Sequence, residues 1–193
     1  MEVFRPTRDG GASVRLNAGE AALLRSLITQ VMDLIADARP EQGTSAGWRD
    51  VGEGPDDLAG LDSLLSGDQP LAAPEDPVLA RLLPDGYRDD PGAASEFRRY
   101  TESSLREAKQ AAAQTLLDTL PAAGGRIRLT GDQARAWLRA LNDVRLAFGV
   151  RLEVTEDFEE QLAVLDPEDP KVAAFEVYGW LGAVQASLVD ALA

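Results

Sequence analysis

The chain has 193 residues and a formal net charge of −14, and it contains neither cysteine nor histidine. These absences exclude disulfides, Cys/His zinc sites and Ser-His or Cys-His catalytic pairs within the chain. A metal would need oxygen ligands, and proton transfer near neutral pH would need a perturbed carboxylate, tyrosine or lysine. The sequence has no phosphate loop, Rossmann fingerprint, nucleophile elbow or metalloprotease motif, and consecutive acids in so acidic a chain usually mark solvated surface. We expect no metal, no cofactor and no catalytic residues.

The charge is unevenly distributed along the chain. Residues 41–91 hold twelve acids against three arginines, and residues 152–193 hold ten acids against one lysine. Residues 126–151 instead hold six arginines against two aspartates. Because most of the surface would repel phosphate backbones, we expect no nucleic-acid partner. Pairing with the acidic C-terminal third explains these arginines more simply than an external anion site does.

Membrane and targeting signals are weak. The longest uncharged run, residues 177–189, has 13 residues, whereas a helix needs about 20 to cross a bilayer. The first residues lack the basic and apolar regions of a signal peptide. We expect a cytoplasmic protein that does not bind membranes.

The N-terminal 40 residues predict a hairpin followed by a helix. Residues 3–5 and 13–16 read as strands joined by a glycine turn. Asn17 and Glu20 form a capping-box pattern that starts a helix reaching about Arg39. Four apolar residues at helical spacing should face the core: Leu24, Ile28, Val31 and Ile35.

Residues 40–74 change to glycine, proline and acids, which is typical of a flexible insert. Trp48 stands alone in this acidic segment. Leu58, Leu61 and Leu65 would lie on one side of a short amphipathic helix. We take these four residues as candidates for docking a protein partner, with the alternative that they cover an edge of their own domain.

Three Asp-Pro pairs predict helix starts, because aspartate caps a helix and proline fits its first turn. They begin predicted helices at residues 77–83, 91–120 and 170–192. The second helix should bury Phe97, Thr101, Ala108, Ala111 and Thr115, with Leu105, Ala112 and Leu116 beside them. The last should bury Val177, Trp180, Leu181, Val184 and Leu188. Apolar residues off that stripe, such as Val189, indicate either a homodimer through this helix or a wide core face.

A second strand, cap and helix begins at residue 127. Thr130 and Gln133 form the capping box, and glycine at 149 is expected to end the helix. The helix should bury Trp137, Leu141, Val144 and Phe148, which match the stripe of the first helix at an offset of 113 residues. We predict a mainly α (α+β) single domain, residues 1–193. It would be a helical bundle with a small sheet formed by the short strands that precede the two similar helices.

One polar group on this helix is a candidate anion site. Arg145 occupies the position in this helix that Met32 occupies in the first helix. A charged side chain aimed toward the core needs a carboxylate or carbonyl partner. A cluster of guanidinium and amide groups would also clamp a carboxylate or phosphate. The candidates are Arg135, Arg139, Asn142 and Arg145, with Tyr87 and Arg88 as neighbours.

Three runs carry a family resemblance: RLLPDGYRDDPGAASEFRRYTE (81–102), RIRLTGDQARAWLRALNDVRLAFGVRLEVTED (126–157) and FEVYGWLGAVQASLVDAL (175–192). They resemble the bacterial domain of unknown function 2017, and WLRALNDVRL (137–146) is the most specific part. The resemblance implies no assigned activity. Members tend to be encoded beside an adaptor of the Clp protease, which implies a link to regulated proteolysis.

Together these features favour a non-enzymatic regulatory or adaptor-like protein that binds a protein partner. The alternative is a small-molecule anion binder, or an enzyme, centred on the Arg135, Arg139, Asn142 and Arg145 cluster.

Overall fold

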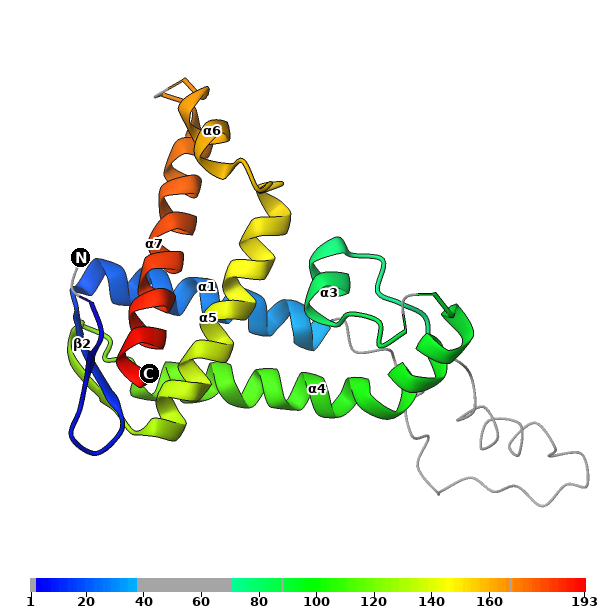
Figure 1. Ribbon diagram of the computed structural model, residues 1–193, viewed down its shortest axis with the longest axis horizontal. Coiled ribbons are helices and arrows are strands. Elements are labelled where there is room, and N and C mark those ends of the chain that lie inside the picture. Colours follow the sequence, from blue (N-terminus) through cyan, green and yellow to red (C-terminus); the bar gives the residue numbers. More distant parts are fainter. Residues whose placement is uncertain (1–2, 38–70, 88, 167) are drawn as a thin grey trace, which may run out of the picture.

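The computed structural model describes residues 3–37, 71–87, 89–166 and 168–193, and over these the predicted fold class is confirmed. The protein is mainly helical with a small antiparallel sheet of strand order β1-β2-β3 (Figure 1). In chain order the described elements are β1 (Arg5–Pro6), β2 (Ala12–Leu16), α1 (Ala18–Asp37), α3 (Pro77–Leu82), α4 (Pro91–Thr119), β3 (Gly125–Leu129), α5 (Gly131–Arg151), α6 (Phe158–Ala163) and α7 (Pro170–Leu192).

Side chains cap the helices where the sequence predicts. In α1 the Glu20 N–H donates to Asn17 Oδ1 over 2.9 Å, and the Asn17 N–H donates to Glu20 Oε2 over 2.8 Å. The Thr130 and Gln133 box forms in the same way at the start of α5. Each predicted aspartate cap also accepts a backbone N–H: Asp76 at α3, Asp90 at α4 and Asp169 at α7.

The sheet joins the two strand-helix units. β2 pairs antiparallel with β3, so that Val14 lies opposite Ile127 and both are buried. The hairpin turn between β1 and β2 is closed by the Thr7 N–H, which donates to Gly11 O over 2.9 Å. A Cβ on Gly11 would lie 2.0 Å from Leu129 O. Glycine at this position therefore allows the turn to approach β3.

Trp137 of α5 lies at the centre of the core and is fully buried. Its ring meets Phe4 edge-on with centroids 5.9 Å apart, and its Nε1–H donates to Thr119 Oγ1 over 2.8 Å. Figure 1 shows α5 and α7 rising from the layer of α1 and α4 and joined at their far end through α6. The predicted stripe residues of α1, α5 and α7 pack in this core: Leu24, Ile28, Leu141, Val144, Leu181, Val184 and Leu188.

The predicted end of α5 at Gly149 is wrong, because the helix continues to Arg151. The left-handed residue is Glu153, with a φ of 54°. Its N–H donates to Val150 O over 3.2 Å, and the Val154 N–H donates to Gly149 O over 2.9 Å. These are the two hydrogen bonds of a Schellman motif. Gly149 instead lies inside the helix, facing the ring of Tyr178 on α7.

The predicted inner face of α4 is also wrong from Phe97 to Ala111. Phe97 is 45% exposed and Leu105 is 38% exposed, and Ala108 and Ala111 lie on the surface. The buried side of this stretch carries Arg98, Glu102 and Arg106. Apolar periodicity misplaces the face because these charged side chains are buried as partners of one another.

Helix α7 is long and apolar enough to cross a membrane by length and composition alone. Here Leu181, Val184 and Leu188 of this helix are buried against α5 and the sheet. Of the residues off the predicted stripe, Phe175 is buried and Val189 is 50% exposed.

Replacement of Trp137 by alanine should lower the free energy of unfolding by about 3–5 kcal/mol, because a large side chain leaves a closed core. Val189→Ala on the exposed side of α7 is the matched control and should change it by less than about 0.5 kcal/mol. Urea denaturation measures both values, and equal costs would contradict the described core.

Candidate functional site

The exposed side of α5 carries three of the candidate anion-binding residues. Arg135 donates to Asp132 Oδ1 over 2.7 Å in an exposed pair one turn away. Arg139 lines an open groove of about 630 Å³ between α4 and α5, beside Ala108 and Thr115. Asn142 is exposed on the same side of the helix. These three residues share a face, and their use as an anion site stays a prediction.

Arg145 points toward α7 instead. Its Nη1 donates to Gln185 Oε1 over 2.8 Å, and its guanidinium lies 5.5 Å from the ring centroid of Tyr178. Within the described residues its Nε has no hydrogen-bond partner. The predicted carbonyl partner is therefore a side-chain amide, assisted by an aromatic face, and not an acid. Since Arg139 and Arg145 lie about 120° apart around the helix, they do not form one clamp.

Tyr87 lies away from this helix face. It is half exposed in the loop before α4, where its ring meets Phe97 edge-on with centroids 5.8 Å apart. Figure 1 shows this loop near the start of α4, whereas α5 begins beyond the opposite end of that helix. The remaining candidates lie outside the described residues, and their roles stay predictions: Arg88, Trp48, Leu58, Leu61 and Leu65.

Sequence reasoning missed a buried charge network on α4. Glu102 lies between two arginines: Oε2 accepts from Arg98 Nη1 over 2.7 Å, and Oε1 accepts from Arg106 Nη2 over 2.7 Å. All three residues are at most 7% exposed. Arg98 also donates to Asp85 Oδ1 over 2.5 Å. Their spacing of four residues is the signal that would have indicated a paired face.

The network ties α4 to the ends of two other helices. Arg106 Nη1 donates over 2.6 Å to the carbonyl of Ile35 in the last turn of α1. Arg98 Nη1 donates over 3.1 Å to the carbonyl of Leu83, the C-cap of α3. Cations are favourable at helix C-termini. Burial lowers the pKa of Arg98, but the hydrogen bonds to Glu102 and Asp85 outweigh this and leave the pKa above its usual value. These contacts indicate a structural role.

A second buried pair joins α4 to α5. Lys109 Nζ lies 2.6 Å from Asp143 Oδ1, and the aspartate is 5% exposed. Burial raises the pKa of Asp143, and the lysine opposes that rise through its hydrogen bond and its charge.

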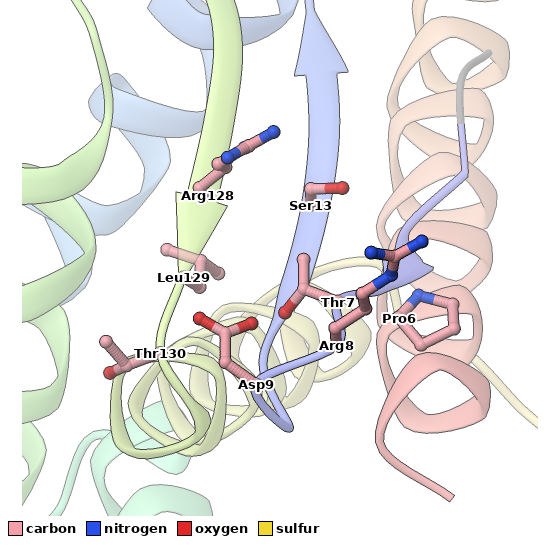
Figure 2. A pocket seen from close by; sticks show the side chains of 8 residues that line it. All are labelled: Pro6, Thr7, Arg8, Asp9, Ser13, Arg128, Leu129 and Thr130. Atoms are coloured by element: carbon pink, nitrogen blue, oxygen red, sulfur yellow. The ribbon is translucent and has the colours of Figure 1, made fainter.

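A polar hollow of about 630 Å³ opens at the turn between β1 and β2. Figure 2 shows Ser13 and Arg128 on neighbouring strands, with Arg8 and Asp9 reaching into the hollow from the turn. A hydrogen bond from Thr7 lowers the pKa of Asp9, with smaller contributions from a backbone hydrogen bond and from the charge of Arg128. Their positions in the sequence do not indicate a shared site, because the pairing of residues 12–16 with 125–129 is what brings them together.

Comparison with known proteins gives the family. A profile described as domain of unknown function (DUF2017) matches residues 1–192. The chain belongs to this family. The resemblance carried by the three sequence runs is therefore confirmed.

The relatives of this family member include named regulators. "Oxidative stress regulator AosR" of Mycobacterium tuberculosis (strain ATCC 25618 / H37Rv) is 38% identical in an alignment 197 residues long, gaps included, that covers 95% of this chain and 83% of the relative. AosR of Mycobacterium leprae (strain TN) is 36% identical over 186 residues, which cover 90% and 78%. No solved structure gives a significant match.

Replacement of Glu102 by glutamine should lower the free energy of unfolding by about 3 kcal/mol, because two buried guanidiniums lose their shared carboxylate. Glu107→Gln, an exposed acid on the same helix, is the matched control and should cost less than about 0.5 kcal/mol. Chemical denaturation distinguishes the two, and equal stability of the variants would remove the structural role of the network.

Replacement of Lys109 by methionine should cost about 3 kcal/mol at pH 7, because the carboxylate of Asp143 stays buried without its cation. Burial already holds the pKa of Asp143 above its ordinary value, and loss of the lysine raises it further. The folded state then binds a proton more tightly than the unfolded state, so the variant regains stability as the pH falls toward about 4.

Lys171→Met changes the other lysine of the chain, which is exposed, and serves as the control. Free energies of unfolding at several pH values give the comparison. A penalty for Lys109→Met that does not shrink in acid would show that Asp143 is not the group responsible.

Proposed function

We propose that this protein is a non-enzymatic regulator that acts in the bacterial response to oxidative stress by binding another protein. The observation that carries this proposal is the similarity to AosR of Mycobacterium tuberculosis over 95% of the chain. Similarity over most of both sequences supports a shared role more strongly than a match to one short motif.

Chemistry supports protein binding over direct sensing. The 193 residues include no cysteine, so no thiol of this chain can be oxidised to a sulfenic acid or a disulfide. A regulator of this kind would receive the oxidative signal through a partner. We further propose a cytoplasmic location and no nucleic-acid or membrane partner, in keeping with the net charge of −14. We propose Clp-type regulated proteolysis as the process involved, since the family resemblance implies this link. We also propose that the protein forms a homodimer through α7.

The role in the stress response can be tested by deleting the gene in the bacterium that encodes it. Survival after hydrogen peroxide treatment should fall, and a plasmid-borne copy should restore it. Colony counts over a range of doses measure the effect. A deletion strain that survives as well as its parent would overturn the stress role.

Protein binding and anion binding make different predictions. A protein partner captured by the parent should be lost when Trp48 or Leu61 becomes alanine. An anion binder would instead lose ligand-induced thermal stabilisation when Arg139 or Asn142 becomes alanine. The groove beside Arg139 is the observation that favours the second candidate. Melting curves with phosphate and dicarboxylates distinguish the two candidates. A gain in melting temperature that disappears when Arg139 or Asn142 becomes alanine would favour the anion binder.

A further inference from the structure

The open side of the small sheet gathers positive charge in an otherwise acidic protein. Alternation along β2 and β3 buries Val14 and Ile127 and turns their neighbours outward. Arg15 lies directly opposite Arg126, and Arg128 lies opposite Ser13, whose other neighbour is Arg5. Arg8 extends the same surface from the turn, beside the hollow in Figure 2. We call this surface the arginine face; its residues are Arg5, Arg8, Arg15, Arg126 and Arg128.

The arginine face has no ion pair among the described residues. All five side chains are exposed, and none lies within 4 Å of a described carboxylate oxygen. Two acids border it. Asp9 accepts a hydrogen bond from Thr7 and interacts with the charge of Arg128 without reaching ion-pair distance, and Glu20 caps α1. Most of the other described arginines donate to a described oxygen: Arg25, Arg98, Arg99, Arg106, Arg135, Arg145 and Arg151. Arg81 and Arg139 do not, but they stand apart from one another, whereas the arginine face gathers five such side chains on one surface.

Packing of the fold does not explain why these positions carry arginine. Like charges directly opposite on neighbouring strands repel one another, and Arg15 and Arg126 occupy such a pair. The outward positions of a sheet accept neutral polar residues as readily, so the fold itself does not require arginine there. A bound anionic group would relieve the repulsion and would use the planar guanidiniums in bidentate contacts.

We propose that the arginine face binds an acidic segment of a partner protein. The strands are five residues long at most, which gives a surface about 17 Å in length. A short segment with several carboxylates fits this length. A nucleic acid would extend beyond the arginine face onto a protein whose net charge is −14, and repulsion there opposes it. This assignment rests on the proposed function as a protein-binding regulator and names the surface and the chemistry of its partner.

The binding test uses the full chain and fluorescent probes. The first is a peptide of about six residues with alternating glutamates, whose extended length of about 20 Å is close to that of the arginine face, and a peptide with glutamine in their place is its control. Fluorescence anisotropy should show binding of the glutamate peptide only. Raising the salt concentration from about 50 to about 300 mM should weaken it, since surface charge interactions are screened.

Variants locate the binding surface. The double variant R15Q/R128Q should bind the glutamate peptide about tenfold more weakly. R81Q/R151Q removes the same charge from exposed positions on α3 and α5, outside both the arginine face and the candidate anion cluster, and should bind like the parent. R15Q should also raise the melting temperature by about 1–3 °C, because the repulsion across the strands is lost. If Arg15 instead stabilised the fold, R15Q would lower the melting temperature.

Other results would overturn the proposal. These are no binding at low salt, equal weakening by both double variants, and tighter binding of a single-stranded DNA oligomer than of the peptide. Tighter binding of a peptide with the sequence of residues 41–70 would assign the arginine face to the chain's own acidic segment. If R15Q/R128Q restores peroxide survival to the deletion strain as well as the parent does, the arginine face is not the regulatory surface and the stress role stands. If deletion has no effect on survival, the stress role fails, and the peptide result alone decides the arginine face.

Discussion

The register between β2 and β3 is the constraint on which the rest of the structure depends. Each strand leads directly into a long helix, α1 or α5, so the pairing of Val14 with Ile127 also sets how these helices approach each other. A slip of one residue in either strand would turn its outward arginine, Arg15 or Arg126, into the core and expose the apolar neighbours of that arginine. The buried Trp137 and the arginine face are therefore two consequences of one pairing.

Arginine holds the helices together at their ends. Arg106 and Arg98 of α4 reach the last carbonyls of α1 and α3, and Arg25 of α1 donates over 2.5 Å to Leu120 O at the end of α4. Each guanidinium presents several N–H donors in a fixed plane, so it can bond a carbonyl and a carboxylate at once. Glu102 compensates the burial of two such cations, because one of its carboxylate oxygens pairs with each of them. Where the chain offers no such oxygen, as on the open side of the sheet, arginine stays in solvent.

Local chemistry could be predicted from the sequence, and contacts between distant segments could not. The capping boxes and the three aspartate caps form because donor and acceptor lie two or three residues apart. The inner face of α4 was misplaced because apolar periodicity cannot recognise charged residues that are buried with partners from α1 and the loop after α3. Arg145 was expected to meet an oxygen, but sequence reasoning could not identify Gln185, which lies 40 residues away on α7. Arg145 is separated from Arg135, Arg139 and Asn142 for the same reason, since the position of α7 decides which side of α5 is buried.

The arrangement of charge also bears on how such a regulator could work. Its internal ion pairs, Arg98 with Glu102 and Lys109 with Asp143, are at least four-fifths buried and poorly screened by salt, so they stay formed over ordinary ionic conditions. The arginine face lies in solvent, where charge interactions are screened and contribute more to the rate of encounter than to affinity. The 193 residues contain no thiol that could change state. On the proposed function, a thiol switch would therefore belong to the partner, and exposing or covering an acidic segment of that partner would control its encounter with the arginine face.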